Sequence, residues 1–130
     1  AAGAKRALPL PVSGAFHSPL VAPAGETMRA ELAGATVSAP TCLFVNNADA
    51  AALSDPAAIR DSLVRQIMSS VRWVETIRRM KELGVTHVLE CGPGKVLAGM
   101  VKRIDAGLHS HALADKAALE QALAALRAIA

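Results

Sequence analysis

The stretch VTHVLECGPGKVLAGMVKRIDAGLHSHAL, residues 85–113, decides the fold. Its apolar opening over 85–91 predicts a strand that stops at Gly92-Pro93-Gly94. We expect a short helix over 95–104 and a last short strand over 109–113. Strands that alternate with helices in this way lie side by side in a parallel sheet. The chain is therefore predicted to be an α/β protein with a parallel sheet.

The N-terminal half continues the alternation of helix and strand. Ser18 followed by Pro19 suits an N-cap and a first helical position, which predicts a helix from there to about Leu32. Gly34 is its expected stop. Residues 41–45 are a continuous apolar run, which is typical of a strand buried on both faces of a parallel sheet.

Three further helices are predicted from apolar side chains spaced three or four residues apart. Ser54-Asp55-Pro56 opens the first, Gly84 ends the second, and Asp115 caps the third. In the second helix Glu75 and Arg79 have the favourable i,i+4 orientation for an ion pair. The side chains expected to face inward are Ile59, Leu63, Ile67, Trp73, Ile77, Met80, Leu119, Leu123 and Leu126.

Composition excludes several classes of protein. The chain has 130 residues, 52% hydrophobic and 19% charged, so it is not a disordered chain. Cys42 and Cys91 are too few for a disulfide scaffold and are expected as small buried residues in a cytoplasmic protein. No apolar run approaches the roughly 20 residues of a membrane-spanning helix. The net charge of +3 comes without a dense basic stripe or stacking aromatics, so neither a membrane nor a nucleic acid is an expected partner.

Known nucleotide and nucleophile motifs are absent. The glycine and lysine of Gly92-Pro93-Gly94-Lys95 suggest a phosphate loop, but a P-loop needs glycine where Leu89 stands and Ser or Thr where Val96 stands. No serine lies in a Gly-x-Ser-x-Gly turn. A serine mechanism therefore cannot be assembled from this sequence alone.

The four histidines and an asparagine pair are the remaining polar candidates. His109 and His111 share one face of a strand, but no cysteine or carboxylate completes a ligand set, so no metal is expected. His87 lies within a strand and is expected as a hydrogen-bonded core or surface residue. Asn46-Asn47 end a strand where ligand crevices open in α/β proteins, although bracing of a turn is the expected role. His17 lies in a loop, where functional residues concentrate, although a lone histidine in a loop is more often inert.

The loop that carries His17 also carries a family resemblance. KRALPLPVSGAFHSPL, residues 5–20, resembles the stretch around the catalytic histidine of bacterial malonyl-CoA:acyl carrier protein transacylases. The similarity continues in the same order over most of the chain, through Val45–Asp49, Ile59–Gln66, Val71–Trp73, Gly92–Leu97 and Lys102–Ile104. Several motifs in one order are more specific than any one of them alone.

This resemblance implies a particular architecture. Residues 13–130 would be the C-terminal part of an α/β-hydrolase-like acyltransferase core with a parallel sheet. Residues 1–12 would be the exit strand of a ferredoxin-like small subdomain. The family's serine in its Gly-His-Ser-x-Gly turn, its glutamine loop and its carboxylate-binding arginine would precede Ala1. This chain would thus carry the base and lack the nucleophile.

The resemblance also implies a chemistry. The family transfers a malonyl group from CoA to the pantetheine thiol of acyl carrier protein through a malonyl-serine ester, with no cofactor, in fatty acid biosynthesis. His17 matches its general base and acid, and Gln66 matches the position whose backbone carbonyl orients that histidine. Phe16 would line the acyl pocket, and Arg6 and Lys5 would meet CoA phosphates or the acidic carrier protein. The partners implied are the CoA thioester, the carrier protein and the missing N-terminal part of the enzyme.

Two other functions remain open at this point. The missing nucleophile allows a non-catalytic α/β module that uses its basic residues to bind an acidic partner such as acyl carrier protein. A nucleic-acid binder rests on net charge alone.

Overall fold

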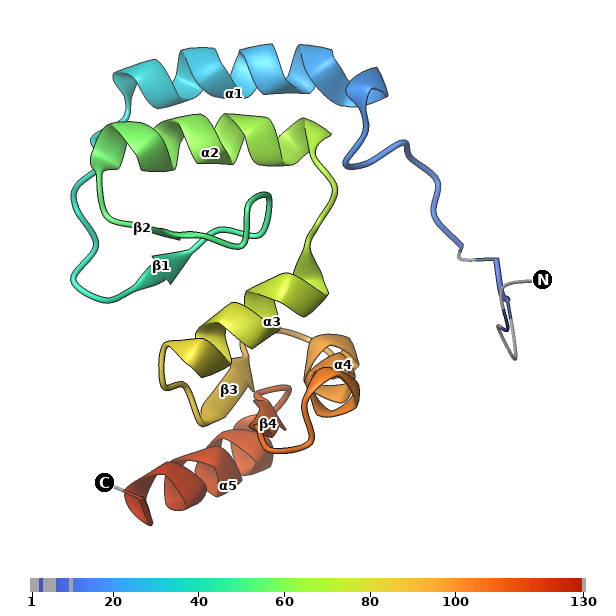
Figure 1. The fold of residues 1–130 in the computed structure, drawn as a ribbon, viewed down its shortest axis with the longest axis vertical. Coiled ribbons are helices and arrows are strands. Elements are labelled where there is room, and N and C mark those ends of the chain that lie inside the picture. The colour runs from blue at the N-terminus through green and yellow to red at the C-terminus, as the bar shows by residue number, and fades with distance from the viewer. Residues whose placement is uncertain (1–2, 4–6, 10, 130) are drawn as a thin grey trace.

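The computed structural model describes residues 3, 7–9 and 11–129. Over that part of the chain, helices and short strands follow one another in mixed order, which confirms the α/β class (Figure 1). The elements are η1 (Pro19–Val21, a 3-10 turn), α1 (Ala22–Gly34), β1 (Phe44–Val45), β2 (Ala52–Leu53), α2 (Pro56–Met68), α3 (Trp73–Glu82), β3 (His87–Glu90), α4 (Val96–Ile104), β4 (His109–Ala112) and α5 (Lys116–Arg127).

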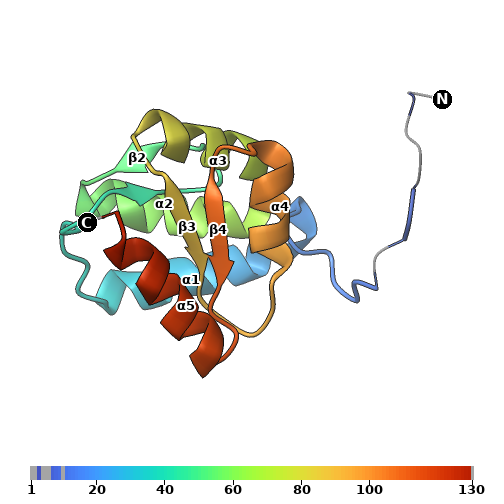
Figure 2. The same ribbon diagram turned by 90° about the horizontal axis from the view of Figure 1, so that it is seen from below.

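The segment from β3 to β4 has the topology that its sequence predicts. β3 and β4 pair in parallel, with His87 opposite His109 and Glu90 opposite Ala112. α4 connects them, and α4 and α5 flank the strand pair (Figure 2). α4 is fixed to the strands by two side chains: Glu90 accepts from the Ala98 N–H at 2.8 Å, and the Ser110 hydroxyl donates to the Ala98 carbonyl at 2.8 Å.

A small apolar core holds this half of the molecule together. Ile77 of α3 and Val101 of α4 are completely buried, and Leu108 is 3% exposed beside them. Four half-buried side chains pack against this cluster: Trp73, Met80, Val88 and Ile104. The inward positions predicted for α3 are therefore confirmed, because its apolar stripe faces α4 across this cluster.

The strand predicted over 41–45 is shorter and differently paired. β1 covers only Phe44–Val45, and it pairs antiparallel with β2, a strand that was not predicted from the sequence. The side chain of Asn46 causes the reversal. Its Oδ1 accepts from the N–H groups of Ala48 and Asp49 at 3.1 and 2.8 Å, and its Nδ2 donates to the Ala51 carbonyl at 3.2 Å. The described chain thus forms two separate two-stranded sheets, and the single parallel sheet is wrong for these residues.

α1 and α2 lie side by side and carry the N-terminal half. The predicted cap at Ser18 is confirmed, because its Oγ accepts from the Leu20 N–H. The helix opening predicted at 54–56 is also confirmed, because α2 begins at Pro56 and an Asp55 carboxylate oxygen accepts from the Ala58 N–H. The helix expected from Ser18 begins as the 3-10 turn and becomes α-helical at Ala22, with a proline in its first turn. Of the inward positions predicted in α2, Ile59 is buried, whereas Leu63 and Ile67 are half-buried.

Several predicted burials are wrong. Leu119 and Leu123 of α5 are each 41% exposed, and Ala122 between them is completely buried. Leucines and alanines alternate around this helix, so spacing alone does not decide which stripe packs against β4. Cys42 and Cys91 are both exposed thiols, because each lies in irregular chain next to a strand and not within it.

The predicted pair between Glu75 and Arg79 does not form. Glu75 instead accepts from Arg72, which precedes α3, and Arg79 donates to Glu82 at 3.0 Å. The cause is the backbone of Arg72, whose N–H donates to the Asn47 carbonyl at 2.8 Å and fixes this side chain next to Glu75.

Residues 7–9 and 11–14 extend away from the helices in both views and are exposed (Figures 1 and 2). The described part of 1–12 forms no strand, so the exit strand of a small subdomain has no counterpart in it, and the domain boundary at 12 stays a prediction. No helix in the described ranges is both long enough and apolar enough to cross a bilayer.

Candidate functional site

The candidate site begins with His17, in the loop before η1. Its φ of +56° lies in the left-handed region, which few residues other than glycine adopt. Ser18 fixes this unusual turn from the next position, because its hydroxyl donates to the Ala15 carbonyl at 2.7 Å and accepts from the Leu20 N–H. The result is an exposed imidazole that is directed toward α2.

The ring of His17 meets a backbone carbonyl. Its Nδ1 lies 3.0 Å from the carbonyl oxygen of Gln66, which is 49 residues away in sequence. A carbonyl oxygen only accepts, so Nδ1 carries the proton in this contact. Nε2 then keeps a free lone pair, which is the state that a general base requires.

The end of α2 explains why the Gln66 carbonyl is available. α2 ends at Met68, and the Arg65 carbonyl accepts from both the N–H and the hydroxyl of Ser69, at 3.0 and 2.8 Å. Carbonyls in the last helical turn lack intrahelical partners. Gln66 therefore presents a neutral acceptor to His17 without placing a charge beside the ring.

A small apolar cavity lies at this contact. It measures about 260 Å³ and is lined by His17, Met28 of α1, and Leu63, Gln66 and Ile67 of α2. These two helices thus supply a rigid apolar wall behind the imidazole. Apolar surroundings with one convergent polar group are typical of ligand sites.

Phe16 does not line this cavity. Its side chain is 69% exposed, and its ring lies over Gly14, where an added Cβ would be 2.7 Å from Cε2 of the ring. Gly14 therefore makes room for the aromatic side chain. Lys5 and Arg6 lie outside the described residues. The substrate-binding roles of these three side chains stay predictions.

A charged network borders the site at Arg65. Its Nη1 and Nη2 donate to the two carboxylate oxygens of Asp49 at 2.9 and 2.7 Å, and its Nε donates to Asp61 at 3.1 Å. The hydrogen bonds from Arg65 hold the pKa of Asp49 below its usual value. The same contact raises the pKa of Arg65 further above its usual range. The sequence gives no signal for this pair, because 16 residues separate its members and no local pattern relates them.

The other polar candidates form a different cluster. The ring of His87 stacks on those of His109 and His111, with centroids 4.7 and 5.9 Å apart. Partial burial, followed by the neighbouring His109 and His111, lowers the pKa of His87. Stacked rings do not converge on one point, and among the described residues no group of three or more histidine, cysteine, aspartate or glutamate side chains could hold a metal.

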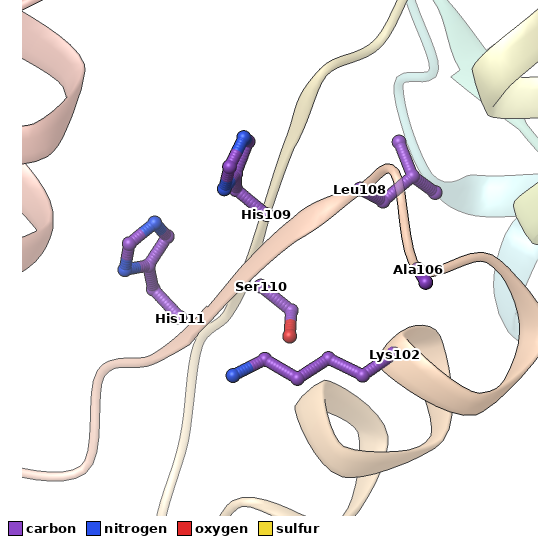
Figure 3. Close-up of a pocket in the computed structure, with 6 residues that line it drawn as sticks. All are labelled: Lys102, Ala106, Leu108, His109, Ser110 and His111. Atoms are coloured by element: carbon purple, nitrogen blue, oxygen red, sulfur yellow. The ribbon is translucent and has the colours of Figure 1, made fainter.

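A cavity of about 310 Å³ lies beside this histidine cluster. Its lining residues are Lys102, Ala106, Leu108, His109, Ser110 and His111. Figure 3 shows the two imidazoles on one side of β4 and the Ser110 and Lys102 side chains on the other. Although this cavity is larger, its polar groups do not converge, so the His17 contact is the better candidate site.

Asn46 has the turn-bracing role that was expected from its sequence. It is 2% exposed, and its side chain makes three hydrogen bonds within the loop between β1 and β2. Its neighbour Asn47 contributes its carbonyl to Arg72. Neither side chain lines the cavity at His17.

Comparison with known proteins identifies relatives over nearly the whole chain. No family model matches. The malonyl CoA-acyl carrier protein transacylase of Salmonella typhimurium is 51% identical over 123 residues, which is 95% of this chain and 40% of that protein. The transacylase of the same name from Bacillus subtilis is 38% identical over 125 residues, 96% of this chain and 39% of that protein.

Solved structures that resemble this chain have the same kind of name as these relatives. An acyl-carrier-protein S-malonyltransferase from Burkholderia pseudomallei matches with a TM-score of 0.85 and 58% identity, over 93% of this chain and 39% of that one. A malonyl-transacylase in complex with its type II PKS acyl-carrier protein matches with a TM-score of 0.86 and 45% identity, over 94% of this chain and 40% of that one.

The proteins that the chain resembles in fold and sequence are acyltransferases of mixed α/β structure. Within that class its homologues are the malonyl CoA-acyl carrier protein transacylases, so the resemblance predicted from the sequence is confirmed. The chain spans about two fifths of the length of the relatives that it matches.

Proposed function

We propose that this chain is the C-terminal part of a malonyl-CoA:acyl carrier protein transacylase and supplies its general base, His17. The observation that carries the proposal is the contact between His17 Nδ1 and the Gln66 carbonyl at 3.0 Å. It leaves Nε2 free to take a proton. The α/β-hydrolase-like core and the ferredoxin-like subdomain at residues 1–12 are part of the same proposal.

The reaction has two halves that use the same imidazole. In the first, Nε2 takes the proton of a serine hydroxyl supplied by the rest of the enzyme, and the serine oxygen bonds to the malonyl thioester carbon. The carbon–sulfur bond breaks, and the imidazolium returns the proton to the CoA sulfur. In the second half, Nε2 takes the proton of the pantetheine thiol, whose sulfur bonds to the ester carbon, and the serine oxygen leaves with that proton.

A backbone carbonyl suits this cycle. The imidazole becomes positively charged twice per turnover and must keep the same orientation each time. The Gln66 carbonyl accepts from Nδ1–H in both the neutral and the charged ring. A neutral acceptor also avoids the desolvation cost that a carboxylate would incur in an apolar cavity.

The remaining contacts of the substrate follow from the family. Phe16 contacts the acyl group, and Arg6 and Lys5 attract CoA phosphates and the acidic surface of acyl carrier protein. The reaction needs no cofactor, and it belongs to fatty acid biosynthesis in the cytoplasm. One solved relative is a complex with an acyl-carrier protein, and this supports the choice of partner.

The test is His17→Ala in the full-length protein, with His109→Ala as the matched control. His109 is an exposed histidine on β4 that does not line the cavity at Gln66. Transfer of labelled malonyl from CoA to holo-acyl carrier protein should fall by about 10²- to 10⁴-fold for His17→Ala, the usual contribution of a general base. The His109→Ala variant should keep wild-type activity.

Two outcomes would contradict the proposal. Unimpaired transfer by His17→Ala would remove this residue from the mechanism. Tight binding of acyl carrier protein by a full-length protein with no transferase activity would favour the non-catalytic binding module instead.

A further inference from the structure

The loop between β1 and β2 is attached to the chain on both sides of the Gln66 carbonyl. On one side, the Asp49 carboxylate accepts from both terminal nitrogens of Arg65. On the other, the Asn47 carbonyl accepts from the N–H of Arg72, and the Asp49 carbonyl accepts from Arg72 Nη1 at 3.3 Å. Figure 1 shows this loop beside the segment that leads from α2 to α3. One loop therefore holds the chain on both sides of Gln66, at Arg65 in α2 and at Arg72 just before α3.

The loop itself is rigid enough to serve as a fixed point. Asn46 is buried, and its side chain fixes the N–H groups of Ala48 and Asp49 within the turn. Asp49 thus approaches Arg65 from a braced backbone. Two parallel N–H···O bonds between a guanidinium and a carboxylate fix orientation as well as distance.

From these contacts we infer that Asp49, acting through Arg65, positions the Gln66 carbonyl and thereby the imidazole of His17. The inference rests on the proposed function, because it assigns Asp49 a role in that reaction. Asp49 is a positioning residue and touches neither substrate nor ring. Its carboxylate sets where the last turn of α2 lies, and the exposed His17 takes its orientation from that turn.

A role confined to stability is the competing explanation. The side chains of Arg65 and Asp49 are 43% and 40% exposed, and ion pairs at such exposure contribute little to folding stability. Loss of the pair should therefore leave the protein folded while its last helical turn shifts. A misplacement of about 1 Å at a catalytic group can cost up to about 10²-fold in rate.

Asp61→Asn is the matched control. Asp61 is the second carboxylate on the same guanidinium, but it belongs to α2 itself, one turn before Arg65. Its removal takes one ion pair from Arg65 without releasing α2 from the loop. Arg65→Lys is the second test variant, because lysine keeps the charge and cannot form the two parallel bonds.

The experiment measures kcat and KM for malonyl-CoA in full-length Asp49→Asn, Arg65→Lys and Asp61→Asn proteins. For the first two, we expect kcat to fall by about 10-fold or more with KM changed less than about twofold, since substrate contacts are untouched. Asp61→Asn should match the wild type. The tautomer of His17 can be followed in nitrogen-15 spectra of labelled histidine, with its signal assigned from the spectrum of His17→Ala. Asp49→Asn should lose the Nδ1–H tautomer, whereas Asp61→Asn should keep it.

The results separate this inference from the proposed function. If Asp49→Asn keeps the wild-type kcat and tautomer while His17→Ala is inactive, Asp49 has no positioning role and the proposed function survives. If Asp61→Asn loses as much kcat as Asp49→Asn, the effect belongs to the charge of Arg65, and the inference is wrong. A fall in kcat that follows a fall in melting temperature, with the tautomer unchanged, also overturns it. An active His17→Ala protein would refute the proposed function itself.

Discussion

Residues 1–130 produced alone should be poorly stable, because their surface is too large for their mass. The structure exposes 9208 Å². A compact monomer of 13.4 kDa exposes about 6,500 Å² by the usual scaling of area with mass. Part of the difference, about 2,700 Å², comes from residues 7–9 and 11–14, which extend away from the helices, and part from apolar side chains that the helices leave uncovered.

The surplus contains large apolar side chains from both halves of the molecule. Leu20 is 80% exposed, Val96 71%, Phe16 69% and Leu43 68%. If only a fifth of the surplus is apolar area that the rest of the proposed full-length protein would cover, about 13 kcal/mol of hydrophobic stabilisation is missing at about 25 cal/mol per Å². Folded domains have a net free energy of unfolding of only about 5–15 kcal/mol, so the missing hydrophobic stabilisation is as large as the net stability of a typical domain.

The assay compares residues 1–130 with the full-length protein by circular dichroism melting, dye binding and sedimentation. We expect a broad transition, binding of a hydrophobic dye and self-association in the short chain, and a cooperative melt in the full-length protein. A monomeric short chain that melts in one sharp transition above about 50 °C, the range of ordinary mesophilic domains, would refute the reasoning from surface area.

Four further outcomes follow from particular residues in the full-length protein. Ile77→Ala should lower the free energy of unfolding by about 2–5 kcal/mol, measured by denaturant titration, because Ile77 is fully buried. The pKa of His87 is lowered in the folded state, so its contribution to stability is present above the unfolded value near 6.5 and declines as the pH falls below it. His87→Gln should therefore flatten the fall in melting temperature between pH 7.5 and 5.5, and an unchanged slope would contradict this. Gly14→Ala should displace the ring of Phe16, which a crystal structure of the variant would show, since the new Cβ would lie 2.7 Å from it. Gln66→Ala should keep most of the transfer activity in the malonyl assay, because it leaves the backbone carbonyl in place.

The sequence predicted elements well where the decisive interactions are local. The caps at Ser18, Asp55 and Asp115 each involve a side chain and an N–H two or three residues on, so the residue types alone identify them. The parallel pair of β3 and β4 was predictable for a similar reason, since the strand–helix–strand pattern lies within residues 85–113.

Prediction failed where distant parts of the chain decide the outcome. β2 is two residues long, so it has no periodicity, and its pairing with β1 depends on the buried side chain of Asn46. The contact of His17 with Gln66 spans 49 residues, and only the family resemblance suggested it. Neither a local sequence pattern nor the family resemblance indicated the ion pair of Asp49 with Arg65.

The use of a backbone acceptor changes which substitutions the proposed site can tolerate. A side-chain acceptor such as a carboxylate is lost with one substitution at its own position. The Gln66 carbonyl survives any substitution there except one that alters the backbone, so the site depends instead on where α2 ends. That end is set by Ser69, which caps the Arg65 carbonyl, and by the side-chain contact of Arg65 with the β1–β2 loop. The orientation of the imidazole is therefore less sensitive to substitution of Gln66, which it contacts, than to substitution of residues that do not contact the ring.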